Sequence, residues 1–118
     1  MVLLGPVDLA GGNATISVTA AYGSFSSSRV QILLAANNST SSAVGLPPPN
    51  GSVLMTAAGY TLRVFWFDND YDGRVTPSDT FRITGNLAPL PPATSFEFTL
   101  EFAYSGGDGR SSIAWTTP

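Results

Sequence analysis

The fold is decided by the stretch Thr94-Ser-Phe-Glu-Phe-Thr-Leu-Glu-Phe-Ala-Tyr104, in which large apolar residues alternate with polar ones. Successive side chains of a β-strand point to opposite faces of its sheet. The apolar residues that would share one face are Phe96, Phe98, Leu100, Phe102 and Tyr104. The polar residues of the other face are Ser95, Glu97, Thr99 and Glu101. This period of two predicts a strand with one buried and one solvated face.

Similar patterns recur along the rest of the chain and predict further strands. They cover residues 14–22, 29–35, 52–56, 60–67, 80–84 and 111–117, and clusters of Gly, Pro, Asn and Ser separate them. No segment has a convincing helical period. About seven strands, with turn signals at short intervals, predict an all-β fold. We expect an antiparallel two-sheet β-sandwich of immunoglobulin-like type, with a closed barrel as the alternative.

The predicted core consists of inward-facing apolar residues of these strands. They are Ile16, Val18, Leu62, Val64, Trp66, Phe81, Ile83, Phe96, Phe98, Leu100, Phe102, Ile113 and Trp115. With 43% hydrophobic residues in 118, this core suffices for a single domain over residues 1–118. Residues 2–9 could be a strand donated to another subunit, and Pro6 would restrict that strand to a sheet edge. We expect a frayed terminus there instead.

The composition excludes several functions. Histidine, cysteine and lysine are absent, so the usual pairs of nucleophile and base cannot be built. Glu97 and Glu101 would lie about 13 Å apart along a strand, which is too far for a pair of glycosidase carboxylates. We therefore expect no enzyme. A net charge of −3 without a basic cluster argues against nucleic acid as a partner, and no stretch is long and apolar enough to span a membrane.

Residues 68–79, between two predicted strands, have the spacing of a calcium loop. Positions 1, 3 and 5 are Asp68, Asp70 and Asp72, and Gly73 stands at the sharp turn in position 6. The remaining ligands of this pattern would be the backbone carbonyl of Arg74, Thr76 at position 9 and Asp79 at position 12. Four carboxylates this close repel one another unless a cation joins them. The sequence therefore predicts a Ca²⁺ site, with a solvated acidic turn as the alternative.

The residues from Tyr60 to Gly85 resemble the strand, DNDxDGxV loop and strand of exported archaeal pilin-like and cell-surface proteins, and position 12 is Asp as in dockerin loops. The resemblance implies an extracellular β-sandwich, the subunit or head domain of a pilus-like filament, with Ca²⁺ as a structural ion. Its partners would be further copies or other surface proteins. The alternative is a secreted, calcium-stabilised carbohydrate-binding module. The candidate aromatic residues for glycan contact are Phe65, Phe67, Tyr71 and Tyr104.

Two further features bear on an exported surface protein. The pattern of N-glycosylation acceptors occurs at Asn13, Asn37, Asn38 and Asn50. On the predicted strand 60–67, Phe65 and Phe67 lie on the face opposite the core residues. Such an apolar outer face is either covered by a proline-rich loop or forms a contact with a subunit or ligand. We expect the cover, and retain the interface as the alternative.

Overall fold

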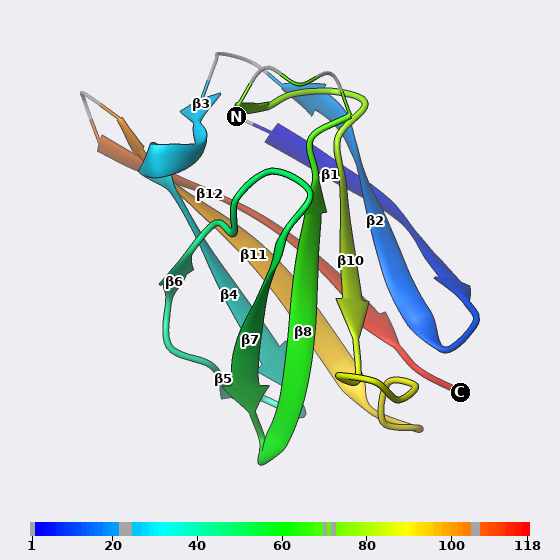
Figure 1. Ribbon diagram of the computed structural model, residues 1–118. Coiled ribbons are helices and arrows are strands. Elements are labelled where there is room, and N and C mark those ends of the chain that lie inside the picture. Colours follow the sequence, from blue (N-terminus) through cyan, green and yellow to red (C-terminus); the bar gives the residue numbers. More distant parts are fainter. Residues whose placement is uncertain (1, 22–24, 70, 72, 105–106) are drawn as a thin grey trace.

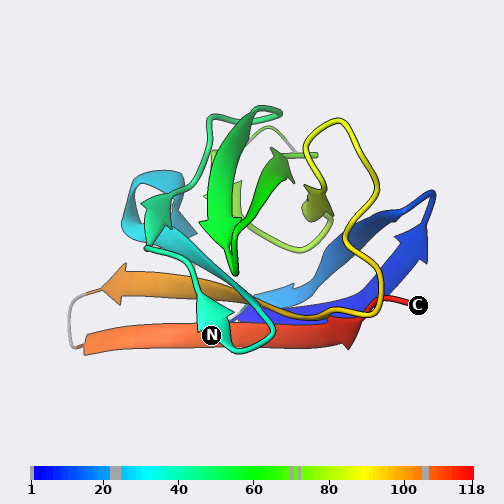
Figure 2. The ribbon, with the colours of Figure 1, turned by 90° about the horizontal axis from the view of Figure 1, so that it is seen from below.

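The computed structural model describes residues 2–21, 25–69, 71, 73–104 and 107–118, and it forms a sandwich of two antiparallel sheets (Figures 1 and 2). In the first sheet the strands are ordered β1 (Val2–Ala10), β2 (Asn13–Ala21), β10 (Thr80–Thr84), β8 (Tyr60–Phe67) and β7 (Ser52–Ala57). In the second sheet they are ordered β12 (Gly107–Thr116), β11 (Ser95–Tyr104), β4 (Val30–Ala36) and β5 (Ser39–Thr40), and β6 (Val44–Gly45) also pairs with β4.

Short elements close one end of the sandwich. The strands β3 (Phe25–Ser26) and β9 (Arg74–Val75) pair with each other, and the 3₁₀ helix η1 (Ser27–Arg29) leads into β4. The described residues contain no α-helix. The order β1-β2-β10-β8 beside β12-β11-β4 matches the ABED and GFC sheets of immunoglobulin domains, with β7 added at the edge. The predicted all-β sandwich is confirmed, and the alternative of a closed barrel is not seen.

The core lies between the two sheets and follows the alternation of the strands. Trp66, Phe81 and Phe98 are fully buried, and the rings of Phe81 and Phe98 meet between the sheets with their centroids 5.1 Å apart. Burying one such side chain contributes about 1.5–3 kcal/mol to folding. The expected core is confirmed, although Ile113 is only partly buried at its margin.

The burial of β4 could not be predicted because nearly all of its residues are apolar. The structure buries alternate side chains of this strand, from Val30 through Ile32 and Leu34 to Ala36. Leu33 and Ala35 lie on the outer face and are half-buried. The strand is central in its sheet, so pairing with β11 sets which side chains face the core.

The expected frayed N-terminus is wrong. Residues 2–10 form the edge strand β1, which pairs with β2 through contacts such as Val7 opposite Ile16. Leu4 and Val7 pack against the core, and this apolar contact holds the segment. The pairing shifts register around Pro6, which lacks an N–H to donate and is tolerated because β1 lies at a sheet edge.

Candidate functional site

The predicted calcium loop, residues 68–79, connects the neighbouring strands β8 and β10. The last pair of their ladder is Phe67 and Thr80, and the side-chain amide of Asn69 donates a 2.6 Å hydrogen bond to the carbonyl of Ser78. Asp68 directly follows Phe67 and Asp79 directly precedes Thr80, so both carboxylates stand at the neck of the loop. Side chains at facing positions of an antiparallel pair have their Cβ atoms about 4.5–5.5 Å apart, so two residues next to the last ladder pair lie near each other.

The carboxylates of Asp68 and Asp79 are buried, with exposures of 1% and 0%. The Oδ2 atom of Asp68 accepts a 2.8 Å hydrogen bond from the N–H of Gly73, and Oδ2 of Asp79 accepts one of 3.2 Å from the N–H of Thr76. Both residues have further contacts. Their Oδ1 atoms are buried and accept no hydrogen bond from described residues. The loop therefore brings two carboxylates together with oxygen atoms turned away from water.

The middle of the loop is fixed to the sandwich by its apolar residue. Val75 is fully buried, and β9 pairs it with Phe25 of β3. Gly73 has a φ of +69°, the left-handed conformation that the sharp turn requires and that glycine adopts without strain. The predicted ligands Asp70 and Asp72 lie outside the described residues. Among the residues that are described, no three His, Cys, Asp or Glu side chains gather into a group that could hold a metal.

Carboxylate oxygens and backbone carbonyls are the ligands that Ca²⁺ prefers. Asp68 and Asp79 supply two such carboxylates, and like charges at facing positions are destabilising without a cation. The buried Oδ1 atoms fit a hard cation at the neck of the loop. Asp68 and Asp79 would contribute carboxylate oxygens, and Arg74 and Thr76 lie in the part of the loop where the pattern places further oxygen ligands.

Phe65 and Phe67 lie half-buried on the outer face of the first sheet, so the proline-rich loop does not cover them completely. Their rings are parallel within 3°, with centroids 6.0 Å apart. The guanidinium of Arg82, on the adjacent strand β10, lies 5.2 Å from the ring centroid of Phe67 in a cation–π contact. The outer face therefore combines aromatic rings with a positive charge.

A groove of about 480 Å³ lies beside Phe65. Arg63, Phe65 and Arg82 line it on the sheet, and the loop 87–89 forms its rim. Arg63 is held in place because it donates hydrogen bonds to Oδ1 of Asn86 at 3.2 Å and to Oγ of Ser52 at 2.7 Å. Within the described residues, neither Arg63 nor Arg82 forms a salt bridge.

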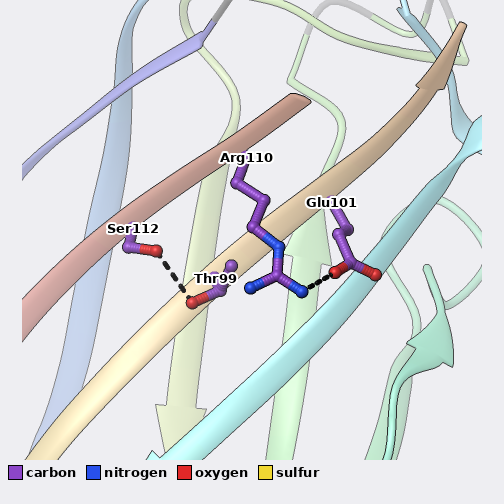
Figure 3. A network of polar contacts seen from close by, with 4 residues as sticks. All are labelled: Thr99, Glu101, Arg110 and Ser112. Carbon is purple, nitrogen blue, oxygen red and sulfur yellow. Dashed lines mark hydrogen bonds and ion pairs between the residues drawn. The ribbon is translucent and has the colours of Figure 1, made fainter. Parts of the chain in front are cut away.

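The outer face of the second sheet carries polar side chains that pair across its strands (Figure 3). Glu101 pairs with Arg110 across β11 and β12, and Thr99 shares a 2.9 Å hydrogen bond with Ser112. Glu97 is exposed and forms no salt bridge with a described residue. As the alternation predicts, these side chains occupy the face away from the core.

The four glycosylation acceptors lie in different settings. Asn37, Asn38 and Asn50 are exposed and have positive φ values of 48°, 70° and 61°, as is common for Asn in turns. The side chain of Asn37 accepts a 3.1 Å hydrogen bond from the backbone of Ser95. Asn13 is half-buried at the start of β2. The aromatic candidates for glycan contact are also dispersed. Tyr71 is 83% exposed on the loop, and the side chain of Tyr104 lies outside the described residues.

Arg63, Arg82 and Leu87 were not predicted to form a group. Arg63 and Arg82 each alternate with core residues, so the sequence places both on an outward face. Their proximity depends on the pairing of β8 with β10, which sets Arg82 opposite Phe65 and Thr84 opposite Arg63. Leu87 is fully exposed, at 101%, and has a φ of +69°. A non-glycine residue in this conformation cannot be recognised from its sequence.

No family model, curated protein or solved structure matches this chain. Within the described residues, no helix is long and apolar enough to cross a lipid bilayer.

Proposed function

We propose that this chain is a calcium-stabilised structural or adhesive module of an extracellular surface assembly, such as a subunit or head domain of a filament. The observation that carries the proposal is the pair of buried carboxylates, Asp68 and Asp79, at the neck of the loop. Two buried carboxylates in such a position favour the binding of a cation beside them. Ca²⁺ suits the oxygen ligands and the spacing of this loop.

The position of the loop supports a structural ion. It joins two neighbouring strands of the first sheet, and the backbone N–H of Val18 on β2 donates a 3.0 Å hydrogen bond to the carbonyl of Asp79. A cation here would hold together three parts of the fold: the end of β8, the start of β10 and the short β3–β9 pair. The described residues contain no α-helix that such binding could move, so a structural role is favoured over a signalling one.

One other observation supports an assembly. The outer face with Phe65 and Phe67 is available for a contact with another molecule, because both rings are only half-buried. A carbohydrate-binding module is less favoured, because Trp66 and Trp115 are both buried in the core.

The proposal is tested by thermal unfolding in excess EDTA and in millimolar Ca²⁺, with particle size followed by light scattering. Ca²⁺ at a hundredfold excess over its Kd stabilises the folded chain by about 2.7 kcal/mol. We expect that rise together with concentration-dependent growth in size. Melting curves that are identical in EDTA and Ca²⁺ would remove the calcium part of the proposal. A chain that stays monomeric at every concentration would remove the assembly part.

A further inference from the structure

The two outer faces of the sandwich carry opposite charges that find no partner within the described chain. On the first sheet, Arg63 and Arg82 lie beside one groove and form no salt bridge. On the second sheet, Glu97 is exposed and likewise forms none. The chain has only five cationic side chains and a net charge of −3. Two arginines on one face that form no salt bridge with a described carboxylate therefore concentrate positive charge there.

The cross-strand neighbours explain why these charges are presented outward. Arg82 is paired with Thr15 on one side and Phe65 on the other, so no acidic side chain stands next to it on the sheet. Asp8, one strand beyond Thr15, is the acidic side chain in that row. Glu97 is flanked by the small residues Ala35 and Ala114, which leave its carboxylate projecting from the sheet.

The shapes of the two faces are complementary as well. Leu87 projects fully into solvent from the rim of the groove that Arg63 and Arg82 line. On the opposite face, a recess of about 320 Å³ lies beside Glu97, with Ala35 and Ala114 in its lining. One face thus presents an apolar projection next to positive charge, and the other presents a hollow next to negative charge.

We propose that copies of this chain stack face to face, with the outer face of the first sheet of one copy against the outer face of the second sheet of the next. Glu97 of one copy would enter the groove between Arg63 and Arg82 of its neighbour, and Leu87 of the neighbour would fill the recess beside Glu97. Because the two contacting faces differ, the contact is heterologous, and repeating it gives an open filament unless the rotation closes a ring. The inference rests on the proposed assembly function and gives its mode.

The faces are large enough for such a contact. The molecule measures 38 × 26 × 22 Å. A strand of ten residues spans about 33 Å, so the sheets extend along the two longer dimensions. A stable interface of standard size buries about 800 Å² on each partner. Most of one sheet face would therefore take part. The half-buried rings of Phe65 and Phe67, the latter in contact with Arg82, would become fully buried in this contact.

The test is a pair of charge reversals, Arg82→Glu and Glu97→Arg. Both residues are exposed and form no salt bridge with a described residue, so each variant is expected to fold. Each single variant should weaken self-association at low salt by about tenfold or more, because it places like charges together. A mixture of the two variants should assemble beyond dimers, because the unaltered faces match as in the wild type and the two reversed faces carry opposite charges. The double variant should again assemble as the wild type does.

The matched control is Arg29→Glu, which changes the net charge by the same amount at an exposed residue of η1, outside both sheets. It should leave association within about twofold of the wild type. Leu87→Ser provides a second probe, which should weaken association without lowering the melting temperature. Association is measured by sedimentation velocity and light scattering up to millimolar chain.

Failure of the stacking mode can be told apart from failure of the proposed function. A wild type that assembles while both single variants assemble equally well would overturn the stacking and leave the assembly function standing. Single variants that do not associate and are not rescued by mixing would also overturn it. A wild type that remains monomeric, but binds polygalacturonate in a way that Arg82→Glu abolishes, would assign the groove to an acidic polysaccharide and reject both the stacking and the assembly.

Discussion

Replacing Asp79 with Asn should make the protein more stable than the wild type without Ca²⁺ and less stable than the wild type with it. Asp79 is fully buried, and it stands with the buried Asp68 at the neck of the loop. Two charges about 5 Å apart at an effective dielectric constant near 20 repel by about 3 kcal/mol. The amide oxygen of Asn can still accept the N–H of Thr76, and the weaker neutral bond costs about 1 kcal/mol. The Asp79→Asn variant should therefore be about 2 kcal/mol more stable than the wild type in EDTA.

In the presence of Ca²⁺ the wild type should be more stable than the Asp79→Asn variant, because the variant lacks a charged ligand at position 12 of the loop. The wild type gains about 2.7 kcal/mol at a hundredfold excess of Ca²⁺ over Kd, and the variant should gain little. For a domain of this size, 1 kcal/mol corresponds to a shift in melting temperature of about 4 °C. We expect Ca²⁺ to raise the melting temperature of the wild type by about 10 °C and to leave that of the variant nearly unchanged.

The assay is thermal unfolding followed by circular dichroism, with isothermal titration of Ca²⁺ on both proteins. The control is Asp8→Asn, which removes the same charge from an exposed residue of β1 and should retain the full response to Ca²⁺. The reasoning is refuted if Asp79→Asn is less stable than the wild type in EDTA and Ca²⁺ changes neither protein. The carboxylate would then be neutralised within the folded chain rather than by a cation.

Three further substitutions test the fold by chemical denaturation at constant Ca²⁺. Phe98→Ala should cost about 3–5 kcal/mol, because it empties a fully buried site between the sheets. A loss below 1 kcal/mol would mean that the core is not packed as described. Gly85→Ala should destabilise clearly, since an added Cβ would lie 2.2 Å from the carbonyl oxygen of Pro89, whereas Gly45→Ala, which meets open space, should be nearly neutral. Equal effects would contradict the loop geometry. Thr117→Val should cost about 1–3 kcal/mol, because its buried hydroxyl accepts the N–H of Thr94 at 3.0 Å, and an unchanged midpoint would contradict this contact.

The sequence by itself determined the class of fold and most of the core. In β11 the contrast between the faces is strong, since Phe96, Phe98 and Leu100 alternate with hydroxyl and carboxylate side chains. Side-chain alternation is a local property of the strand, so it can be recognised before any strand partner is known. The same holds for the loop, because the spacing of its carboxylates is a property of twelve consecutive residues.

The tertiary structure decided what depends on contacts between distant segments. Residues 2–10 form a strand because they pair with β2 and because Leu4 and Val7 pack against the core. The inward face of β4 was set by its pairing with β11, since its own residues are nearly all apolar. Neither the strand at residues 2–10 nor the inward face of β4 can be recognised from the local sequence.

The two charged faces also required the tertiary structure. Arg63 and Arg82 are nineteen positions apart in the chain, and they line one groove because β8 and β10 are neighbours in the sheet. Sequence alternation placed each of these side chains, and Glu97, away from the core. The order of the strands in the two sheets decides to which outer face each charged side chain belongs. It also decides which of these side chains have no oppositely charged neighbour on that face. The physical reason is that alternation fixes the direction of a side chain, whereas its neighbours are fixed by strand pairing.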